Sequence, residues 1–494
     1  MKKIIILIML PAVLFIGACG EFLDVNHDPN NTEESTKALV FPAGVENTAN
    51  VFGGSWQILG SIWSQHWTSE PNAPQFQGED RYEVQAGDYN YDLRGWEYLY
   101  TRSLMDYEWV KLQAKADQDW NYYLMANVMQ AYTYQVLIDF FDQIPFSGAL
   151  QKEPAAFEPG EKVYDSLIVR LDEALAKDFD APTCTKPGNA DLLFNGAMND
   201  WVRFANTLKL KLYLRQRFAN PTTAQEGIQA LFDEGAEFID KNAEFSNFLD
   251  ESGRDNYCYA IEFRGGSINM CASKTILDYL VDEGDQRIDT MFTEGTGGYK
   301  GMYQGDIRNQ YSYDTEPETY SKPIITPIQP VVFMSAVETK LMLAEIALVY
   351  GLGGDAETLY QEAVDMDFDR KGIKLEGGDT PDYKTFNGDQ EHDLEILIVE
   401  KWVALANTQG METYFEHNRT GYPRESDVLI SDDNFATQYT EGEFIVSASG
   451  VLPPSNPYPK RLLLPSSEES KNPNFPGREP IYEPVWWDVR DYPY

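Results

Sequence analysis

Helical periodicity recurs along most of this 494-residue chain and constrains its fold more than any other feature. In Asp165–Lys177, the apolar residues Leu167, Ile168, Leu171 and Leu175 recur at intervals of three and four, so they lie on one stripe of a helix. The same kind of pattern covers residues 37–69, 96–115, 120–142, Asn199–Phe218, Val337–Tyr350 and Ala356–Phe368. The sequence therefore predicts a mostly α-helical fold.

Two pairs of these helices form a weak internal repeat. Val337–Tyr350 and Ala356–Phe368 are separated by GLGGD, whose glycines suit a helix C-cap and a turn. Helix 120–142 is likewise followed by a helix that carries Tyr164, as the later pair carries Tyr360. Such pairs resemble tetratricopeptide repeats of about 34 residues, with a generic helical hairpin as the alternative. Helix pairs of this kind stack into a superhelix with a continuous core.

Three segments interrupt the helical pattern with irregular sequence rich in Gly, Pro, Asp and Tyr. They are residues 70–95, 245–333 and 421–494. We expect one domain, residues 37–494, in which the scaffold of residues 37–244 and 334–420 carries these segments as long loops with short strands. Long loops within compact domains are often binding loops.

The N-terminus reads as a targeting segment. Lys2 and Lys3 precede thirteen residues, 4–16, that are apolar apart from Pro11; this run is too short to span a bilayer but suits a secretory signal. The sequence Ile16-Gly17-Ala18-Cys19 resembles the lipobox of bacterial lipoproteins, where the cysteine is released by cleavage and carries lipid such as palmitate. We therefore expect residues 1–18 to be a signal peptide and 19–36 a lipidated tether; an ordinary secretory signal is the alternative.

The formal net charge of −40 limits the partners of the chain. A protein this acidic repels phosphate backbones, so we expect no nucleic-acid partner. The charge suits a neutral or cationic ligand, or serves only to keep the protein soluble.

The cysteines and histidines give no metal or cofactor signature. Besides Cys19 there are three cysteines, and the spacing of Cys258 and Cys271 would allow a disulfide between them. The four histidines show no metal spacing, and no CxxC occurs, so a zinc site is disfavoured. We predict no cofactor and no metal.

Two stretches imitate ligand motifs. Asp365, Asp367, Asp369 and Glu376 have the 1, 3, 5, 12 spacing of a calcium loop, but Arg370 stands where its glycine is needed, so the stretch is interpreted as structural. The run EGTGGYKG lacks the lysine–Ser/Thr ending and the preceding strand of a phosphate-binding loop. There is no G-x-S-x-G motif and no evident Ser/His/Asp set, so we predict a protein without enzymatic activity.

Aromatic and amide side chains gather in the loop segments. Sugar rings have apolar faces that stack on Trp and Tyr, and their hydroxyls need fixed polar partners; a peptide site would use many of the same residues. The candidate ligand contacts are Trp67, Gln75, Tyr82, Tyr89, Tyr91 and Trp96 around the first segment, and Asn256, Tyr257, Tyr259, Tyr303, Tyr311, Tyr313 and Tyr320 in the second.

Several motifs, in order, resemble the SusD-like (RagB-type) outer-membrane lipoproteins of Bacteroidetes. DVNHDPN after Cys19 and FDQIPFSGAL at 141–150 match the family's N-terminal half. The helix EKWVALANTQGMETYFEHNRTGYP at 400–423 and the stretch YPKRLLLPSSEESKNPNF at 458–475 match its C-terminal part. The departure at residues 141–143, Phe-Asp-Gln for aromatic-Gly-Asp, is minor.

The resemblance implies a SusD-like fold and a lipid-anchored protein on the extracellular face of the outer membrane. Such proteins lie as lids on a SusC-like TonB-dependent transporter and hand it captured ligand. We expect an oligosaccharide ligand, and leave open an oligopeptide ligand, a lipid-anchored glycoside hydrolase or an adhesion protein.

Overall fold

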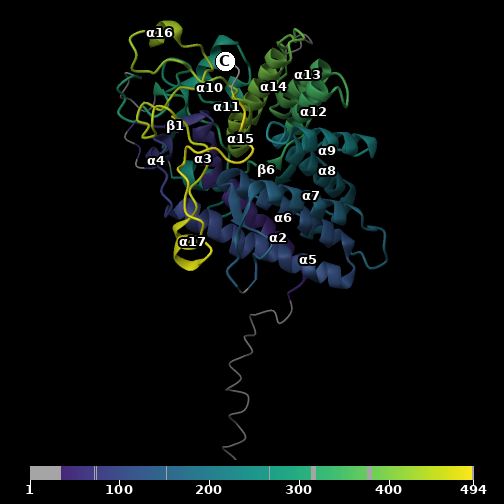
Figure 1. Cartoon of the computed structure of the whole chain (residues 1–494). Coiled ribbons are helices and arrows are strands. Elements are labelled where there is room, and N and C mark those ends of the chain that lie inside the picture. The colour runs from purple at the N-terminus through teal and green to yellow at the C-terminus, as the bar shows by residue number, and fades with distance from the viewer. Residues whose placement is uncertain are drawn as a thin grey trace, which may run out of the picture.

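The computed structural model describes residues 35–491 except 72, 74, 152, 266–267, 313–318 and 375–380. Helices form one side of the molecule, where α8, α9, α12 and α13 lie, and loop-rich chain forms the other, around β1, α4, α10 and α16 (Figure 1). This arrangement confirms the predicted mostly α-helical, tetratricopeptide-like fold. The signal peptide, Cys19 and nearly all of the tether lie outside the described residues.

Most of the described helices lie where the periodicity predicts them, but those over 221–233 and 274–282 were not predicted, and the second falls in the segment expected to be irregular. The longer ones are α2 (Lys37–Phe52), α3 (Ser55–Trp63), α5 (Met105–Asp117), α6 (Trp120–Phe141), α7 (Gly160–Leu175), α8 (Met198–Arg215), α9 (Pro221–Asp233), α10 (Lys274–Asp282), α12 (Ala336–Tyr350), α13 (Ala356–Arg370), α14 (Gln390–Leu405) and α15 (Gly410–Thr420). The short ones are α4 (Gln77–Asp80), α11 (Ile288–Met291), α16 (Phe435–Gln438), α17 (Ser466–Lys471), the π-helical turns η1 (Tyr89–Glu97), η2 (Leu99–Leu104) and η4 (Tyr259–Phe263), and the 3₁₀ turn η3 (Gly188–Ala190).

The pair α12–α13 shows why the predicted hairpin forms. Gly351 ends α12 in the left-handed region at φ 67°, which glycine adopts without strain. Asp355 then caps α13 by accepting a 2.9 Å hydrogen bond from the backbone N–H of Thr358. Leu341 of α12 and Ala363 of α13 are buried in one small core shared by the pair, so the hairpin closes on apolar contact.

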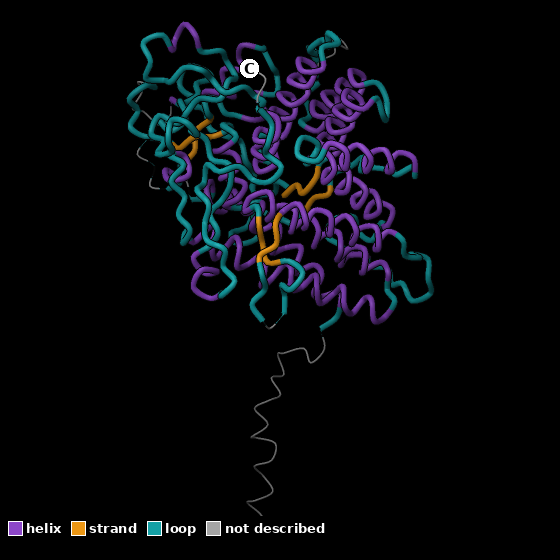
Figure 2. The backbone as a smooth tube through the Cα atoms, viewed as in Figure 1, coloured by secondary structure: helices purple, strands orange, loops and turns teal. Residues whose placement is uncertain are grey.

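The described residues form three two-stranded antiparallel sheets, two of which link segments that are far apart in the sequence (Figure 2). They pair β1 (Trp67–Ser69) with β5 (Met270–Ala272), β2 (Gln143–Pro145) with β3 (Phe157–Pro159), and β4 (Ala243–Phe245) with β6 (Val331–Met334). Ala243 is opposite Met334 and Phe245 is opposite Val331, so the second loop segment leaves and re-enters the scaffold at the same place.

The first loop segment is more ordered than the sequence predicts. Residues 70–95 contain α4 and most of η1. Asp88 begins η1 by accepting a 2.8 Å hydrogen bond from the N–H of Asn90, a short-range cap within a stretch that reads as irregular.

The structure also bears on the possible disulfide, on the calcium-like motif and on membrane-spanning helices. Cys258 and Cys271 are both buried free thiols. The calcium-like spacing falls on α13, where buried Asp367 pairs with Arg287 at 2.9 Å and Arg370 at 2.6 Å; Glu376 lies outside the described residues. No helix in the described part of the chain is long and apolar enough to cross a membrane.

A buried ionic network joins the scaffold helices. Glu345 on α12 accepts two 2.7 Å hydrogen bonds from Arg419 on α15 and pairs with Arg217 at 2.8 Å. Glu412 on α15 pairs with Arg215 at 2.7 Å and Lys211 at 3.1 Å, both on α8. Its members are Lys211, Arg215, Arg217, Lys401, Arg419, Asp139, Glu338, Glu345, Glu412 and Glu416.

Charge pairing keeps Glu412 ionised inside the protein. Burial alone would raise the pKa of Glu412, but Arg215, Lys211 and Lys401 lower it to about 2. Removing one partner of a buried pair leaves a charge without compensation, which costs far more than the pair itself contributes.

We therefore expect Glu345→Gln to destabilise the fold strongly, by about 3–5 kcal/mol, because Arg217 would lose its carboxylate partner and Arg419 would keep only Glu416. The exposed pair Lys340–Glu362, at 2.8 Å, provides the control, and Glu362→Gln should change stability by less than about 1 kcal/mol. Chemical denaturation measures both. Equal midpoints for the two variants would contradict the central role of the network.

Candidate ligand-binding face

The three predicted loop segments, of which the first two carry the predicted ligand contacts, converge on one side of the molecule. β1 pairs with β5, with Trp67 opposite Ala272 and Ser69 opposite Met270, which brings the first segment against the second. The third segment joins them where Val451 N–H donates to the Arg81 carbonyl at 3.0 Å. Figure 1 shows the yellow C-terminal chain running beside β1, α3 and α4.

The side chain of Asp80, at the end of α4, lies at the centre of this convergence. Its Oδ2 accepts hydrogen bonds from Thr68 Oγ1 at 2.8 Å and from the Ser69 N–H at 2.9 Å. Its Oδ1 accepts a hydrogen bond from Gln304 Nε2 of the second segment. Ser447 of the third segment donates to the Asp80 carbonyl at 2.7 Å. One residue thus binds all three segments.

Asp80 is fully buried, and within the described residues no lysine or arginine forms an ion pair with it. Burial raises the pKa of Asp80 to about 7, and hydrogen bonds from Ser69, Thr68 and Gln304 only partly oppose this. Gln304 Oε1 has no hydrogen-bond partner in the part of the chain that the structure describes.

Gln65 makes a second junction next to α3. Its Nε2 donates to the Ile445 carbonyl at 2.7 Å, and its Oε1 accepts from the Ile445 N–H at 3.1 Å. Oε1 also accepts from Thr275 Oγ1 at 2.7 Å. The loops are therefore held by side-chain amides and hydroxyls rather than by long strands.

Six of the predicted ligand contacts belong to the core instead. Trp67 is fully buried and donates through Nε1 to Asn407 at 2.7 Å, and Tyr91 donates to Glu79 at 2.8 Å. The others are Tyr82, Trp96, Asn256 and Tyr320, each at most 3 % exposed. These side chains pack on protein atoms, so the ligand contacts predicted for them do not fit their positions. A Trp or Tyr in a loop-like sequence is ambiguous because loops that fold onto a scaffold also need anchors.

The other predicted contacts retain exposed surface. Gln75 and Tyr89 are exposed, and Tyr89 is 53 % exposed with Arg94 over its ring. Tyr257, Tyr259, Tyr303 and Tyr311 are half-buried, and Tyr313 lies outside the described residues. For these residues ligand contact stays a prediction.

Tyr303 and Tyr311 lie on one well-supported loop. The buried carboxylate of Asp306 accepts the backbone N–H groups of Gln310, Tyr311 and Ser312 at 2.7, 2.9 and 2.6 Å. The ring of Tyr303 packs edge-on against Phe435, with centroids 5.6 Å apart. We call the surface around Tyr303 and Tyr311 the loop face.

Tyr257 and Tyr259 lie in a different place, beside β4. Tyr257 packs against Phe248 at 5.3 Å, and Tyr259 stacks on Phe263 at 6.2 Å. The half-buried tyrosines predicted to contact ligand therefore lie in two separate places. The sequence also offers no signal for Phe435, because it lies more than 100 residues after Tyr303 in the chain.

Comparison with known proteins identifies the family. The model of the SusD-like family described as "starch-binding associating with outer membrane" matches residues 29–437. The chain belongs to the SusD-like family. No curated protein matches it.

Solved SusD homologues share the fold at low sequence identity. A chitin-binding homologue from Flavobacterium johnsoniae has a TM-score of 0.74 at 20 % identity, covering 92 % of this chain and 100 % of its own. A SusD-like protein from Bacteroides thetaiotaomicron has a TM-score of 0.73 at 21 % identity, covering 92 % and 99 %. A homologue from Bacteroides uniformis has a TM-score of 0.72 at 20 % identity, covering 91 % and 99 %.

The raised pKa of Asp80 makes stability depend on pH. Because the folded protein holds this proton more tightly than the unfolded chain, the contribution of Asp80 is full below about pH 4 and declines as pH rises to about 7. Asp80→Asn removes this titration. The stability of the variant relative to the original protein should rise between pH 4 and pH 8 by up to about 4 kcal/mol.

Chemical denaturation at the two pH values measures the difference, and the exposed Asp433→Asn is the control. A stability difference between Asp80→Asn and the original protein that is the same at both pH values would show that Asp80 is ionised in the fold.

Proposed function

We propose that this SusD-like protein is a lipid-anchored surface protein that binds oligosaccharides and delivers them to a SusC-like TonB-dependent transporter. The observation that carries the proposal is the family match over residues 29–437, whose description names starch binding and outer-membrane association. The chitin-binding homologue from Flavobacterium johnsoniae adds a second glycan-binding relative. The folded body, residues 37–494, would act as one domain without enzymatic activity.

The loop face supplies the chemistry for capture. Tyr303 and Tyr311 offer aromatic surface for the apolar face of a sugar ring, and neighbouring backbone and amide groups offer hydrogen bonds to hydroxyls. Asp306 fixes the loop before ligand arrives, so less conformational entropy is lost on binding. Gln75 and Tyr89 are further candidate contacts.

We expect Tyr303→Ala and Tyr311→Ala each to weaken glycan binding about tenfold, through loss of one stacking surface. Isothermal titration with maltohexaose and chitohexaose, chosen from the family description and the chitin-binding homologue, measures this effect. Tyr98→Ala is the control, because Tyr98 lies between η1 and η2 under Arg102, at 4.0 Å.

Other outcomes of the same experiment favour the alternatives. Binding of oligopeptides but of neither sugar would favour the peptide-binding function, and release of shorter sugars would favour a hydrolase. Unchanged sugar affinity in both loop variants would remove the loop face from the proposal.

The anchor is tested separately. Cys19→Ser should abolish incorporation of labelled palmitate and remove the protein from the outer-membrane fraction, because the sulfur would carry the lipid. Cys184→Ser, which changes a half-buried free thiol, should leave labelling unchanged. Palmitate on the Cys19→Ser protein, or unaltered anchoring, would contradict the lipoprotein assignment.

A further inference from the structure

Residues 303–312 form a closed loop that carries both tyrosines of the loop face. Its two ends meet, because the Tyr303 N–H donates to Ser312 Oγ at 3.3 Å. Two turns lie between them: the Asp306 N–H donates to the Tyr303 carbonyl at 3.1 Å, and the Asn309 N–H donates to the Asp306 carbonyl at 2.8 Å. Compact surface loops whose ends are close are frequently functional. Every residue of this loop is described.

Side chains fix the backbone of this loop on both sides of Arg308. Before it, the carboxylate of Asp306 is buried and accepts three backbone N–H groups of the same loop. After it, Asn309 Oδ1 accepts a 2.7 Å hydrogen bond from the hydroxyl of Tyr320. Gln304, at the base of the loop, donates through Nε2 to the Ile62 carbonyl at 3.2 Å. The backbone that carries Arg308 is therefore positioned before any ligand arrives.

The side chain of Arg308 is exposed, and within the described residues it forms no hydrogen bond, ion pair or contact with an aromatic ring. Every other arginine of the chain has at least one such partner there. All N–H donors of the Arg308 guanidinium are thus open to a ligand.

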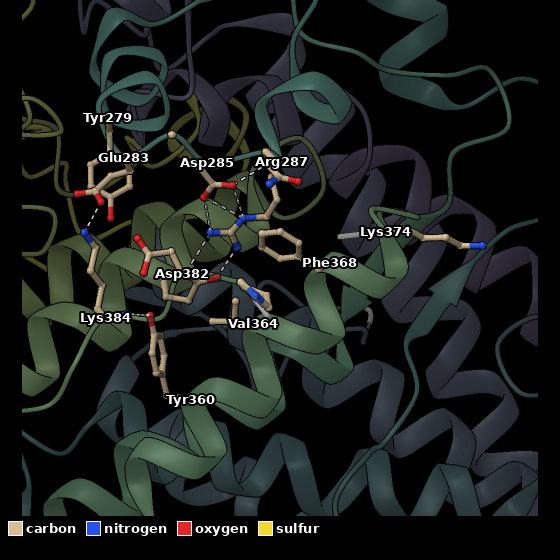
Figure 3. Close-up of a pocket in the computed structure, with 14 residues that line it drawn as sticks. Tyr279, Glu283, Asp285, Arg287, Tyr360, Val364, Phe368, Lys374, Asp382 and Lys384 are labelled. Carbon is tan, nitrogen blue, oxygen red and sulfur yellow. Dashed lines mark hydrogen bonds and ion pairs between the residues drawn. The ribbon is translucent and has the colours of Figure 1, made fainter. Parts of the chain in front are cut away.

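Arg287 shows the contrasting case, in a pocket of about 470 Å³ (Figure 3). Its Nε donates to Asp285, Nη1 to Asp367 and Glu400, and Nη2 to Asp285 and Glu400. These bonds use all five N–H groups of the guanidinium. A carboxylate on a ligand would find Arg287 already paired, whereas Arg308 offers the same group unpaired.

The exposed charge of the loop is positive, although the whole chain carries a net charge of −40. Asp306 is the other charged residue between Tyr303 and Ser312, and its buried carboxylate faces backbone N–H groups. Lys274, paired with Asp278, adds a cation 5.4 Å from the centre of the Tyr303 ring. Because salt screens exposed charges beyond about 8 Å at physiological ionic strength, distant acidic groups oppose an anion at this loop only weakly.

We propose that Arg308 determines the ligand specificity of the loop face by binding the carboxylate of an acidic oligosaccharide, a chain that contains uronic acid residues. A guanidinium binds a carboxylate through two parallel N–H···O bonds, which are stronger than hydrogen bonds to a neutral hydroxyl. Tyr303 and Tyr311 would stack on the sugar rings, and Arg308 would recognise the acid group beside them. The inference rests on the proposed function and narrows its ligand to acidic glycans.

Isothermal titration of the full chain tests this with hexasaccharides of galacturonate, of mannuronate and of hyaluronan, each compared with its neutral methyl ester. The ester keeps the rings and the hydroxyls and removes only the charge. At least one acidic chain should bind about tenfold more tightly than its ester, and Arg308→Ala should abolish this difference. Added sodium chloride should weaken binding of the acidic chain and leave binding of the ester unchanged.

Two further variants separate geometry from charge. Arg308→Lys keeps the positive charge but loses the paired N–H groups, so it should bind the acidic chain severalfold more weakly. Arg254→Ala is the matched control, because Arg254 is exposed on another turn, where it pairs with Glu251 at 3.1 Å. This variant should bind as the original protein does.

The proposal is overturned if no acidic chain binds more tightly than its ester, or if Arg308→Ala keeps the preference. Neutral hexasaccharides that bind through Tyr303, with no effect of Arg308→Ala on any sugar, would leave the proposed function intact and remove the role of Arg308. Absence of binding by every sugar, acidic or neutral, would instead contradict the proposed function itself.

Discussion

The buried pairing of Glu345, Glu412 and Glu416 with arginines and lysines is the interaction on which the rest of the scaffold depends. Five carboxylates and five cations meet between α6, α8, α12, α14 and α15, with no net charge. Such a network is costly to bury and costly to disturb, because any shift of one helix leaves an ion without its partner. It therefore favours one relative placement of helices that come from opposite ends of the sequence.

The loop side is held together by different chemistry. Asp80 and Gln65 bind the loop segments through hydrogen bonds, and no ion pair of Asp80 is found in the described chain. Because burial raises the pKa of Asp80 to about 7, the protonated carboxyl group avoids the cost of a buried unpaired charge below that pH, and its oxygens still accept hydrogen bonds. Ion pairs thus fix the scaffold, whereas hydrogen bonds make the loop junctions at Asp80 and Gln65, beside the ion pair of Lys322 with Glu70.

The loop face follows from this division. It takes its geometry from the hydrogen bonds of Asp306 and from packing of Tyr303 on Phe435. A buried polar group thus positions two aromatic side chains, Tyr303 and Tyr311, that keep exposed surface.

The sequence by itself determined most of the helices, because apolar spacing of three and four depends only on local order, as in Leu167, Ile168, Leu171 and Leu175. It also determined the family, through motifs such as RTGYP at 419–423. Only the tertiary structure decided which loop aromatics are exposed. Trp67 and Tyr311 lie in similar polar, aromatic sequence, yet Trp67 is buried against Asn407, 340 residues later, and Tyr311 keeps exposed surface. Burial of this kind depends on long-range contacts such as β1 with β5, which no local pattern encodes.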